Sequence, residues 1–187
     1  MNVGKVWAWA ITVALGGFLF GFDTAVISGA NAVIKAEWAL TDLAIGQMVA
    51  AALYGTIIGA LFGGIPADKY GRKVSLIGIA LLFLISAIGS ALATDVFVLS
   101  LARFIGGLGV GASSVVAPLY ITEMAPAKYR GQLVAAFQFN LVVGILVAYF
   151  SNYAVDAAGF SDNWRLMLGI EILPAALFLL LLFRVPR

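Results

Sequence analysis

The stretch Gly16–Ala30, GGFLFGFDTAVISGA, carries a single carboxylate, Asp23, within an otherwise apolar run. Apolar residues continue on its N-terminal side to Val6, so the run exceeds the roughly 20 residues that span a bilayer. An ionisable side chain inside a membrane helix costs about 2.5–3.5 kcal/mol on insertion scales, and such groups are usually partnered and functional. The stretch therefore predicts a membrane helix with a functional acid on it.

The composition of the whole chain is that of an integral membrane protein. Of its 187 residues, 63% are hydrophobic and 11% charged, whereas soluble domains have about 25% charged residues. The chain has no histidine and no cysteine, which excludes histidine-based catalysis and disulfides. No nucleophile–base pair, metal-ligand cluster or cofactor motif stands out, so we expect neither an enzyme nor a cofactor or metal site, and no nucleic-acid partner.

The length criterion predicts six helices, which we assign to one domain over residues 1–187. Their expected ranges are 6–30, 43–66, 74–93, 97–123, 132–153 and 164–184. An even number of spans puts both termini on one side of the membrane. That side would carry Lys5, Lys69, Arg72, Lys73, Lys128, Arg130, Arg184 and Arg187, against Lys35 and Arg165 on the other. Because Lys and Arg are enriched in cytoplasmic loops, we expect a multi-pass cell-membrane protein with both termini in the cytoplasm.

Three ionisable residues, Asp23, Arg103 and Glu171, fall well inside apolar runs. At 1.5 Å per residue, all three lie roughly 10–12 Å below the outer surface. We therefore expect a cluster with Arg103 at its centre and one negative charge in excess, which favours binding of a proton. This suggests proton-coupled transport. The alternative is a static ion network that fixes helix packing, and the two interpretations can hold for different members.

Glycine-rich helices and a loop motif complete the pattern. Small residues at 55–64 and 106–112 predict close helix packing, and Pro66, Pro118 and Pro174 can kink their helices. The loop GGIPADKYGRK, residues 63–73, fits G-x-x-x-D-[RK]-x-G-R-[RK]. In it, Gly71 permits a tight turn and Arg72 is free to pair with an acid from another helix. Glu123 and Arg130 follow with the spacing E-x6-R.

These motifs resemble the sugar-porter subfamily of the major facilitator superfamily. The stretches GGFLFGFDTAVISGA, RFIGGLGVG, PLYITEMAP, QFNLVVGILVAY and NWRLMLGIEILPA resemble its helices 1, 4, 5 and 6 in order. The resemblance implies an all-α membrane protein. Its six transmembrane helices would form the N-terminal half of a bacterial sugar/proton symporter, built as two three-helix repeats.

The resemblance also assigns roles to individual residues. Asp23 matches the proton-coupling acid, with Arg103 and Glu171 as its partners. Gln138 matches an amide that hydrogen-bonds the sugar, Phe20 matches an aromatic beside the substrate, and Ile145 lies on the Gln138 face; from residue type alone, Gln138 could equally join helices. A cytoplasmic gating network would comprise Gly64, Asp68, Gly71, Arg72, Lys73, Glu123 and Arg130.

Only the first half of a twelve-helix sugar porter is matched. Our leading expectation is a half-sized transporter that works as a parallel homodimer and moves a monosaccharide with a proton by alternating access. Alternatives are an N-terminal half or fragment that needs a separate second half, an uncoupled facilitator, or a non-transporting sugar-binding protein. The expected partners are a monosaccharide, a proton, the lipid bilayer and a second copy or complementary half, with pentose and hexose both open.

Overall fold

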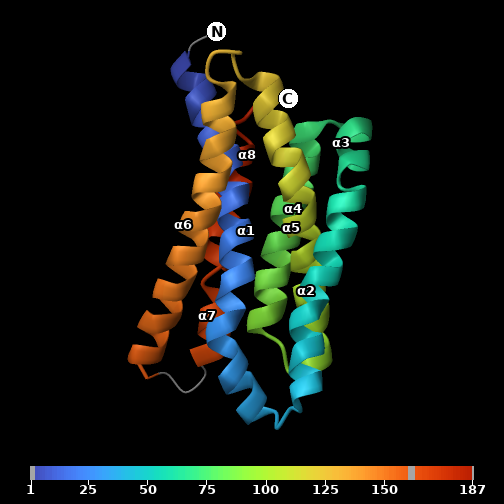
Figure 1. Ribbon diagram of the computed structural model, residues 1–187, viewed down its shortest axis with the longest axis vertical. Helices are drawn as coiled ribbons and strands as arrows, with labels where there is room; N and C mark the ends of the chain where they lie inside the picture. The colour runs from blue at the N-terminus through green and yellow to red at the C-terminus, as the bar shows by residue number, and fades with distance from the viewer. Residues whose placement is uncertain (1–2, 160–162, 187) are drawn as a thin grey trace.

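A computed structural model describes residues 3–159 and 163–186, and every element in this part of the chain is a helix (Figure 1). In chain order the helices are α1 (Val3–Glu37), α2 (Asp42–Phe62), α3 (Gly64–Tyr70), α4 (Arg72–Ala91), α5 (Val96–Met124), α6 (Arg130–Ala157), α7 (Asn163–Gly169) and α8 (Ile172–Leu182). Six stretches are long and apolar enough to cross a membrane, with α7 and α8 together forming the sixth. The expected six-helix all-α membrane fold is confirmed.

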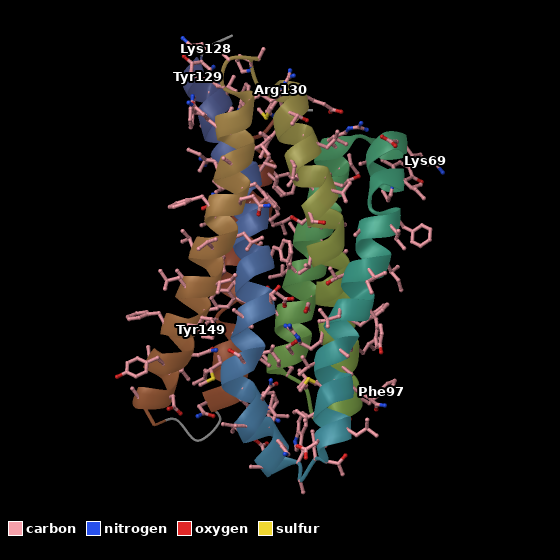
Figure 2. The ribbon with its side chains drawn as sticks, viewed as in Figure 1. Lys69, Phe97, Lys128, Tyr129, Arg130 and Tyr149 are labelled. Carbon is pink, nitrogen blue, oxygen red and sulfur yellow. The ribbon has the colours of Figure 1, made fainter. Side chains whose placement is uncertain are left out.

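The start of α1 and the end of α8 lie at the same end of the bundle, beside α3 (Figure 1). Lys69, Lys128 and Arg130 lie at that end too (Figure 2). Arg187, which entered the charge comparison, lies outside the described residues. The basic residues thus gather at the end that holds both chain ends.

Two predicted helices are interrupted, and a proline follows each interruption. The helix expected at 43–66 ends at Phe62, since the ring of Pro66 crowds the Phe62 carbonyl four residues before it. The chain resumes as α3 in place of the expected loop. Gly71 separates α3 from α4 with a φ of 90°, a left-handed conformation that glycine adopts without steric cost. The predicted loop motif is therefore a short helix followed by a glycine turn.

The second interruption divides the helix expected at 164–184 into α7 and α8. Pro174 has no N–H to bond to the Ile170 carbonyl, which instead accepts from the Leu173 N–H at 3.1 Å. Glu171 is the N-cap residue of α8 and lies at this break. Helix α1 also differs from its prediction, because it continues to Glu37 rather than ending at residue 30.

Two helix pairs make backbone contacts through glycine. Helix α1 packs on α6, where a Cβ on Gly21 would lie 2.0 Å from the Leu141 carbonyl oxygen and one on Gly144 would lie 2.1 Å from that of Phe18. Helix α2 packs on α5 in the same way through Gly107 and Gly111. In each pair, the first helix of one three-helix repeat meets the second helix of the other, so the two repeats are joined at two equivalent seams.

Replacing Gly107 with alanine is expected to destabilise the bundle by about 1–3 kcal/mol or more, the usual effect of forcing extra volume into a packed interior. The new Cβ would lie 2.0 Å from the carbonyl oxygen of Ala52, so α2 and α5 would have to separate. Thermal unfolding in detergent measures the loss. Gly78→Ala is the matched control, since a Cβ there meets nothing within 4 Å. Equal unfolding midpoints for the two variants would contradict the close packing of α2 on α5 at Gly107.

Candidate functional site

A buried ion pair joins α1 to α5. Arg103 Nη1 donates to Asp23 Oδ1 at 2.6 Å, and Arg103 Nη2 donates to the Asp23 backbone carbonyl at 2.8 Å. The two side chains are 3% and 2% exposed. Burial of a charge is expensive unless it is paired and hydrogen-bonded, so each of these residues makes the burial of the other tolerable. The expected pairing of Asp23 with Arg103 is therefore present.

Glu171 adds a second carboxyl group to this pair from the α7–α8 break. It is 2% exposed and interacts electrostatically with Asp23 and Arg103. Two carboxyl groups that share one guanidinium in a buried site favour the binding of a proton by one of them. Its other contacts are incomplete, because Glu171 Oε1 is buried without a partner among the described residues. The three residues together, called the charged cluster below, can chemically hold a proton.

The charged cluster lies between two hydrophobic cores. One core contains Leu19, Phe83 and Phe178, and the other contains Phe22, Leu99 and Leu168. Along α1, Asp23 follows directly after Phe22, and along α5, Arg103 comes one turn after Leu99. The charges therefore share one level of the bundle, as the depth comparison predicted, and along α1 and α5 they are flanked by apolar side chains.

A second ion network lies at the end that holds α3. Arg72 donates to Glu123 through Nη2 at 3.0 Å and to Asp68 through Nη1 at 2.8 Å. Lys73 instead donates to the backbone carbonyls of Phe183 and Val185 at the end of α8. Arg130 was expected in this network, but it forms no ion pair with any residue that the structure describes. It lies with Lys128 and Tyr129 at the start of α6 (Figure 2).

The Arg72–Glu123 pair is expected to show a small positive coupling, because both side chains are partly exposed and such pairs contribute little. A double-mutant cycle with Arg72→Gln and Glu123→Gln, followed by thermal unfolding, measures it. Arg130→Gln with Glu123→Gln is the matched control cycle and should show no coupling. A coupling free energy in the control cycle as large as that in the Arg72–Glu123 cycle would contradict this prediction.

The three predicted sugar-contacting residues lie along the α1–α6 seam. Gln138 is exposed on α6 and follows Phe137, whose carbonyl contacts Gly17 of α1. Phe20 and Ile145 are half-buried beside the same seam. Phe20 is three residues from Asp23, so one helix carries both the seam and the acid of the charged cluster.

A polar cluster at the opposite end of the bundle was not predicted. The indole N–H of Trp164 donates to Glu37 Oε2, and Arg165 Nη1 lies 3.5 Å from Glu37 Oε1. Arg165 also donates to the Ala93 carbonyl at 3.0 Å and stacks over the Trp164 ring. The Trp164 side chain is fully buried. The sequence feature that could have predicted this cluster is the pair Trp164-Arg165, which follows directly after a polar loop, together with Glu37 at the end of α1.

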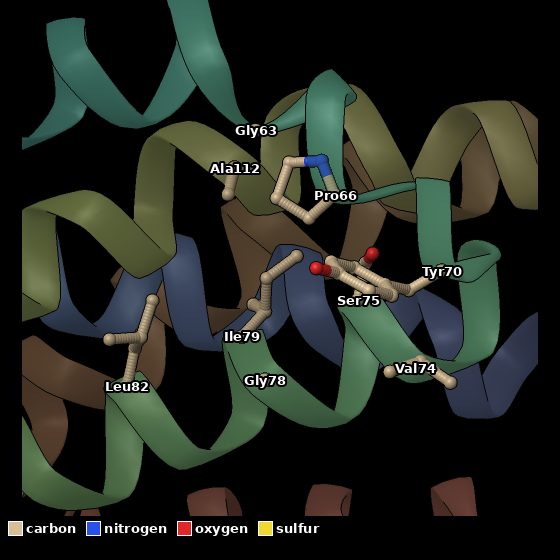
Figure 3. Close-up of a pocket in the computed structure, with 9 residues that line it drawn as sticks. All are labelled: Gly63, Pro66, Tyr70, Val74, Ser75, Gly78, Ile79, Leu82 and Ala112. Atoms are coloured by element: carbon tan, nitrogen blue, oxygen red, sulfur yellow. The ribbon is translucent and has the colours of Figure 1, made fainter. Parts of the chain in front are cut away.

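An apolar pocket of about 330 Å3 lies where α3, α4 and α5 meet, beside the break between α2 and α3 (Figure 3). Its lining residues are Gly63, Pro66, Tyr70, Val74, Ser75, Gly78, Ile79, Leu82 and Ala112. The Ser75 hydroxyl is already bonded to the Gly71 carbonyl at 3.2 Å. This lining suits hydrocarbon better than the hydroxyl groups of a sugar, so we do not assign the pocket to substrate.

Comparison with known proteins identifies the family of this bundle. A family model described as "Sugar (and other) transporter" matches residues 9–187. The chain belongs to the sugar transporter family. Among curated members of the family, the arabinose-proton symporter of Bacillus subtilis (strain 168) is 40% identical over 191 residues, which cover 100% of this chain and 41% of the relative.

Solved structures of a sugar transporter have the same helix arrangement. The proton:xylose symporter XylE of the major facilitator superfamily, bound to 6-bromo-6-deoxy-D-glucose, matches with a TM-score of 0.94 and 37% identity over 100% of this chain and 46% of that chain. The inward-open xylose transporter XylE from E. coli matches with a TM-score of 0.90 and 38% identity, over 97% and 48%. The chain thus spans less than half the length of these sugar transporters and corresponds to their N-terminal part.

Proposed function

We propose that this chain takes part in proton-coupled transport of a monosaccharide and that the charged cluster is its proton-binding group. The observation that carries the proposal is the buried set of two carboxyl groups and one guanidinium on three helices. With all three ionised, the cluster keeps one negative charge in a low-dielectric interior, and one bound proton removes it. A static packing network would be better served by equal numbers of acids and bases.

The sugar is proposed to bind against the α1–α6 seam. The exposed amide of Gln138 offers one acceptor and two donors for hydroxyl groups, and the Phe20 ring offers an apolar face. The relatives named above are described as acting on arabinose and xylose, which supports a monosaccharide as the substrate class. Ile145 would complete the apolar wall on the same face.

Alternating access would use the Arg72 network as a clamp. Asp68 and Arg72 belong to the α3–α4 motif, while Glu123 lies in the last turn of α5, so the ion pairs hold α4 against α5 at one end of the bundle. We propose that this is the cytoplasmic end, because it carries the basic residues and both chain ends (Figure 2). Gly64, Gly71 and Lys73 would shape the same clamp, and Arg130 would join it in another conformational state.

A second six-helix bundle is needed to close the sugar site. We propose that a second copy of this chain or a complementary half supplies it, since the relatives are more than twice as long as the matched region. The homodimer remains our leading form. In it, the two halves would be related by an axis along the membrane normal, as in this superfamily.

Uptake of labelled arabinose, xylose and glucose into proteoliposomes tests the proposal. Uptake driven by an imposed pH gradient with the chain alone would support a working homodimer. Uptake only after a complementary half is added would support a two-part transporter. Uptake insensitive to the pH gradient would replace coupling with facilitated diffusion, and sugar binding without flux in either form would overturn transport.

Because the chain has no cysteine, single cysteines report the assembly without background. If two copies face each other across the sugar site, Gln138→Cys should form a disulfide-linked dimer in membranes. Phe97→Cys, which is exposed at the far end of α5 (Figure 2), is the matched control and should remain monomeric. Equal crosslinking of both variants, or of neither, would contradict the homodimer.

A further inference from the structure

Two serines on α4 are bonded differently from most hydroxyl groups in the bundle. Nine serines and threonines within the described helices donate to a backbone carbonyl three or four residues earlier, namely Thr12, Thr24, Ser28, Thr56, Ser75, Ser100, Ser114, Thr122 and Ser151. Ser86 and Ser90 are buried, and their hydroxyls have no partner among the described residues. Being four residues apart, they share one face of α4.

Ser86 faces the charged cluster across Gly106. A Cβ on Gly106 would lie 2.4 Å from Ser86 Oγ and 3.3 Å from Asp23 Oδ1, so both oxygens border the same small space. No direct hydrogen bond joins them, since Ser86 Oγ is without a protein partner. Both oxygens lie within 3.3 Å of one position beside Gly106, which is within the span of a single bridging water molecule.

Like Ser86 Oγ, two atoms of the charged cluster have no hydrogen-bond partner among the described residues. Arg103 Nε and Glu171 Oε1 are buried without a partner among the described residues. Buried polar groups are nearly always hydrogen-bonded, to ordered water where no protein group is available, and a water needs two to four polar partners. Ser86 Oγ on α4, Arg103 Nε on α5 and Glu171 Oε1 at the α7–α8 break are therefore three buried groups around Asp23 that bound water can satisfy.

Ser90 extends this line of hydroxyls toward the end of α4. Helix α4 ends at Ala91, and Ala93 just beyond it accepts a hydrogen bond from Arg165. Ser86 lies about 6 Å further into the bundle than Ser90, at 1.5 Å per residue. The two serines thus lie between the Glu37–Arg165 end of the bundle and the charged cluster.

We propose that Ser86 and Ser90, with bound water, form a proton relay that reaches Asp23 from the end of α4, apart from the α1–α6 seam proposed for the sugar. The proposal rests on the function proposed above. The charged groups facing the relay are Asp23 from α1, Arg103 from α5 and Glu171 from the α7–α8 break, with Glu37 and Arg165 at its entrance.

The transfer is a sequence of balanced proton exchanges. A hydronium ion at the entrance gives its proton to the Ser90 end of the relay, and each hydroxyl releases its own proton inward as it accepts one from the outer side. The bridging water passes a proton to the Asp23 carboxylate as its O–H bond breaks and the new O–H bond forms. One proton is gained by the acid and one is lost by the solvent, with no oxidant or reductant.

Time-resolved infrared spectroscopy of the protein in nanodiscs, after laser release of caged protons, tests the relay. The carboxylic-acid carbonyl band reports the rate of protonation, and a pH titration of the same band reports its midpoint. Ser86→Ala should slow protonation at least tenfold with the midpoint retained, and Ser86→Thr should restore the rate by returning a hydroxyl. A purely structural serine would shift the midpoint or the unfolding temperature instead.

A second variant tests the bridging space without removing the hydroxyl. Gly106→Ala fills the space between Ser86 and Asp23 and should also slow protonation at least tenfold. The matched controls are Ser75→Ala, whose hydroxyl is bonded to its own helix, and Gly109→Ala, whose nearest neighbour lies at 3.4 Å; both should protonate at the original rate. Unchanged rates in Ser86→Ala and Gly106→Ala would overturn the relay alone, whereas a carboxyl band that survives the combined Asp23→Asn and Glu171→Gln changes would overturn the proposed proton site.

Discussion

Replacing Asp23 with asparagine is expected to reduce sugar accumulation to a ratio of about 1 while downhill exchange continues. One proton crossing about 100 mV supplies about 2.3 kcal/mol, which corresponds to about a fifty-fold concentration ratio at 1.36 kcal/mol per tenfold. Asparagine keeps the size of the side chain and one acceptor for Arg103, but it has no carboxylate to take up a proton. The ratio of labelled sugar inside and outside proteoliposomes, with counterflow as the second assay, measures the change.

The control for this experiment is a carboxylate outside the charged cluster. Asp42 is exposed at the start of α2 and pairs with Lys35, so Asp42→Asn removes the same charge and should leave accumulation intact. An Asp23→Asn protein that still concentrates sugar under the pH gradient would refute the coupling role. Loss of downhill exchange as well would show that Asp23 is needed for the transport cycle itself.

Replacing Arg103 with leucine is expected to destabilise the bundle by about 3–5 kcal/mol, the usual effect of removing one partner of a buried ion pair. The guanidinium is the only cation among the buried residues that the structure describes. Without it, Asp23 and Glu171 are left as two acids in an apolar interior. Thermal or chemical unfolding in detergent measures the loss.

A further variant tests whether Arg103→Leu loses stability because it leaves buried charges unpaired. Adding Asp23→Asn and Glu171→Gln to Arg103→Leu should recover much of the lost stability, because no buried charge then remains unpaired. Arg184→Leu removes an exposed arginine at the end of the bundle and should change stability little. If the triple variant is as unstable as Arg103→Leu, the arginine acts through packing rather than through charge.

The sequence was sufficient for the number of spans and for the charged cluster, and both have a simple physical basis. Spans follow from apolar length, and the depth of a charge follows from the rise per residue. Those two quantities brought Asp23 and Arg103 together without any knowledge of tertiary contacts. The predicted end of α1 is too early, because the polar residues Lys35 and Glu37 suggest a loop, whereas the helix continues and carries Glu37 to Trp164.

Other features depended on tertiary contacts that leave a weak trace in sequence. Pro66 and Pro174 marked positions of possible bending, but whether a helix bends or breaks depends on which carbonyl finds another donor. Serines in apolar helices usually bond to their own backbone, so nothing in the sequence separates Ser86 from Ser75. Arg130 has the expected spacing from Glu123, yet spacing along the chain does not fix where its side chain points.

The ion pair between α1 and α5 also bears on how the protein is made. Asp23 and Arg103 are 80 residues apart, so at 5–20 residues per second a ribosome needs about 4–16 s to synthesise the arginine after the acid. During that interval the nascent α1 must enter the membrane with its acid neutralised by a proton or held near the lipid headgroups. The final position of Asp23 is therefore reached only after α5 has been inserted, so α1 enters the membrane before α5 but settles only once α5 is in place.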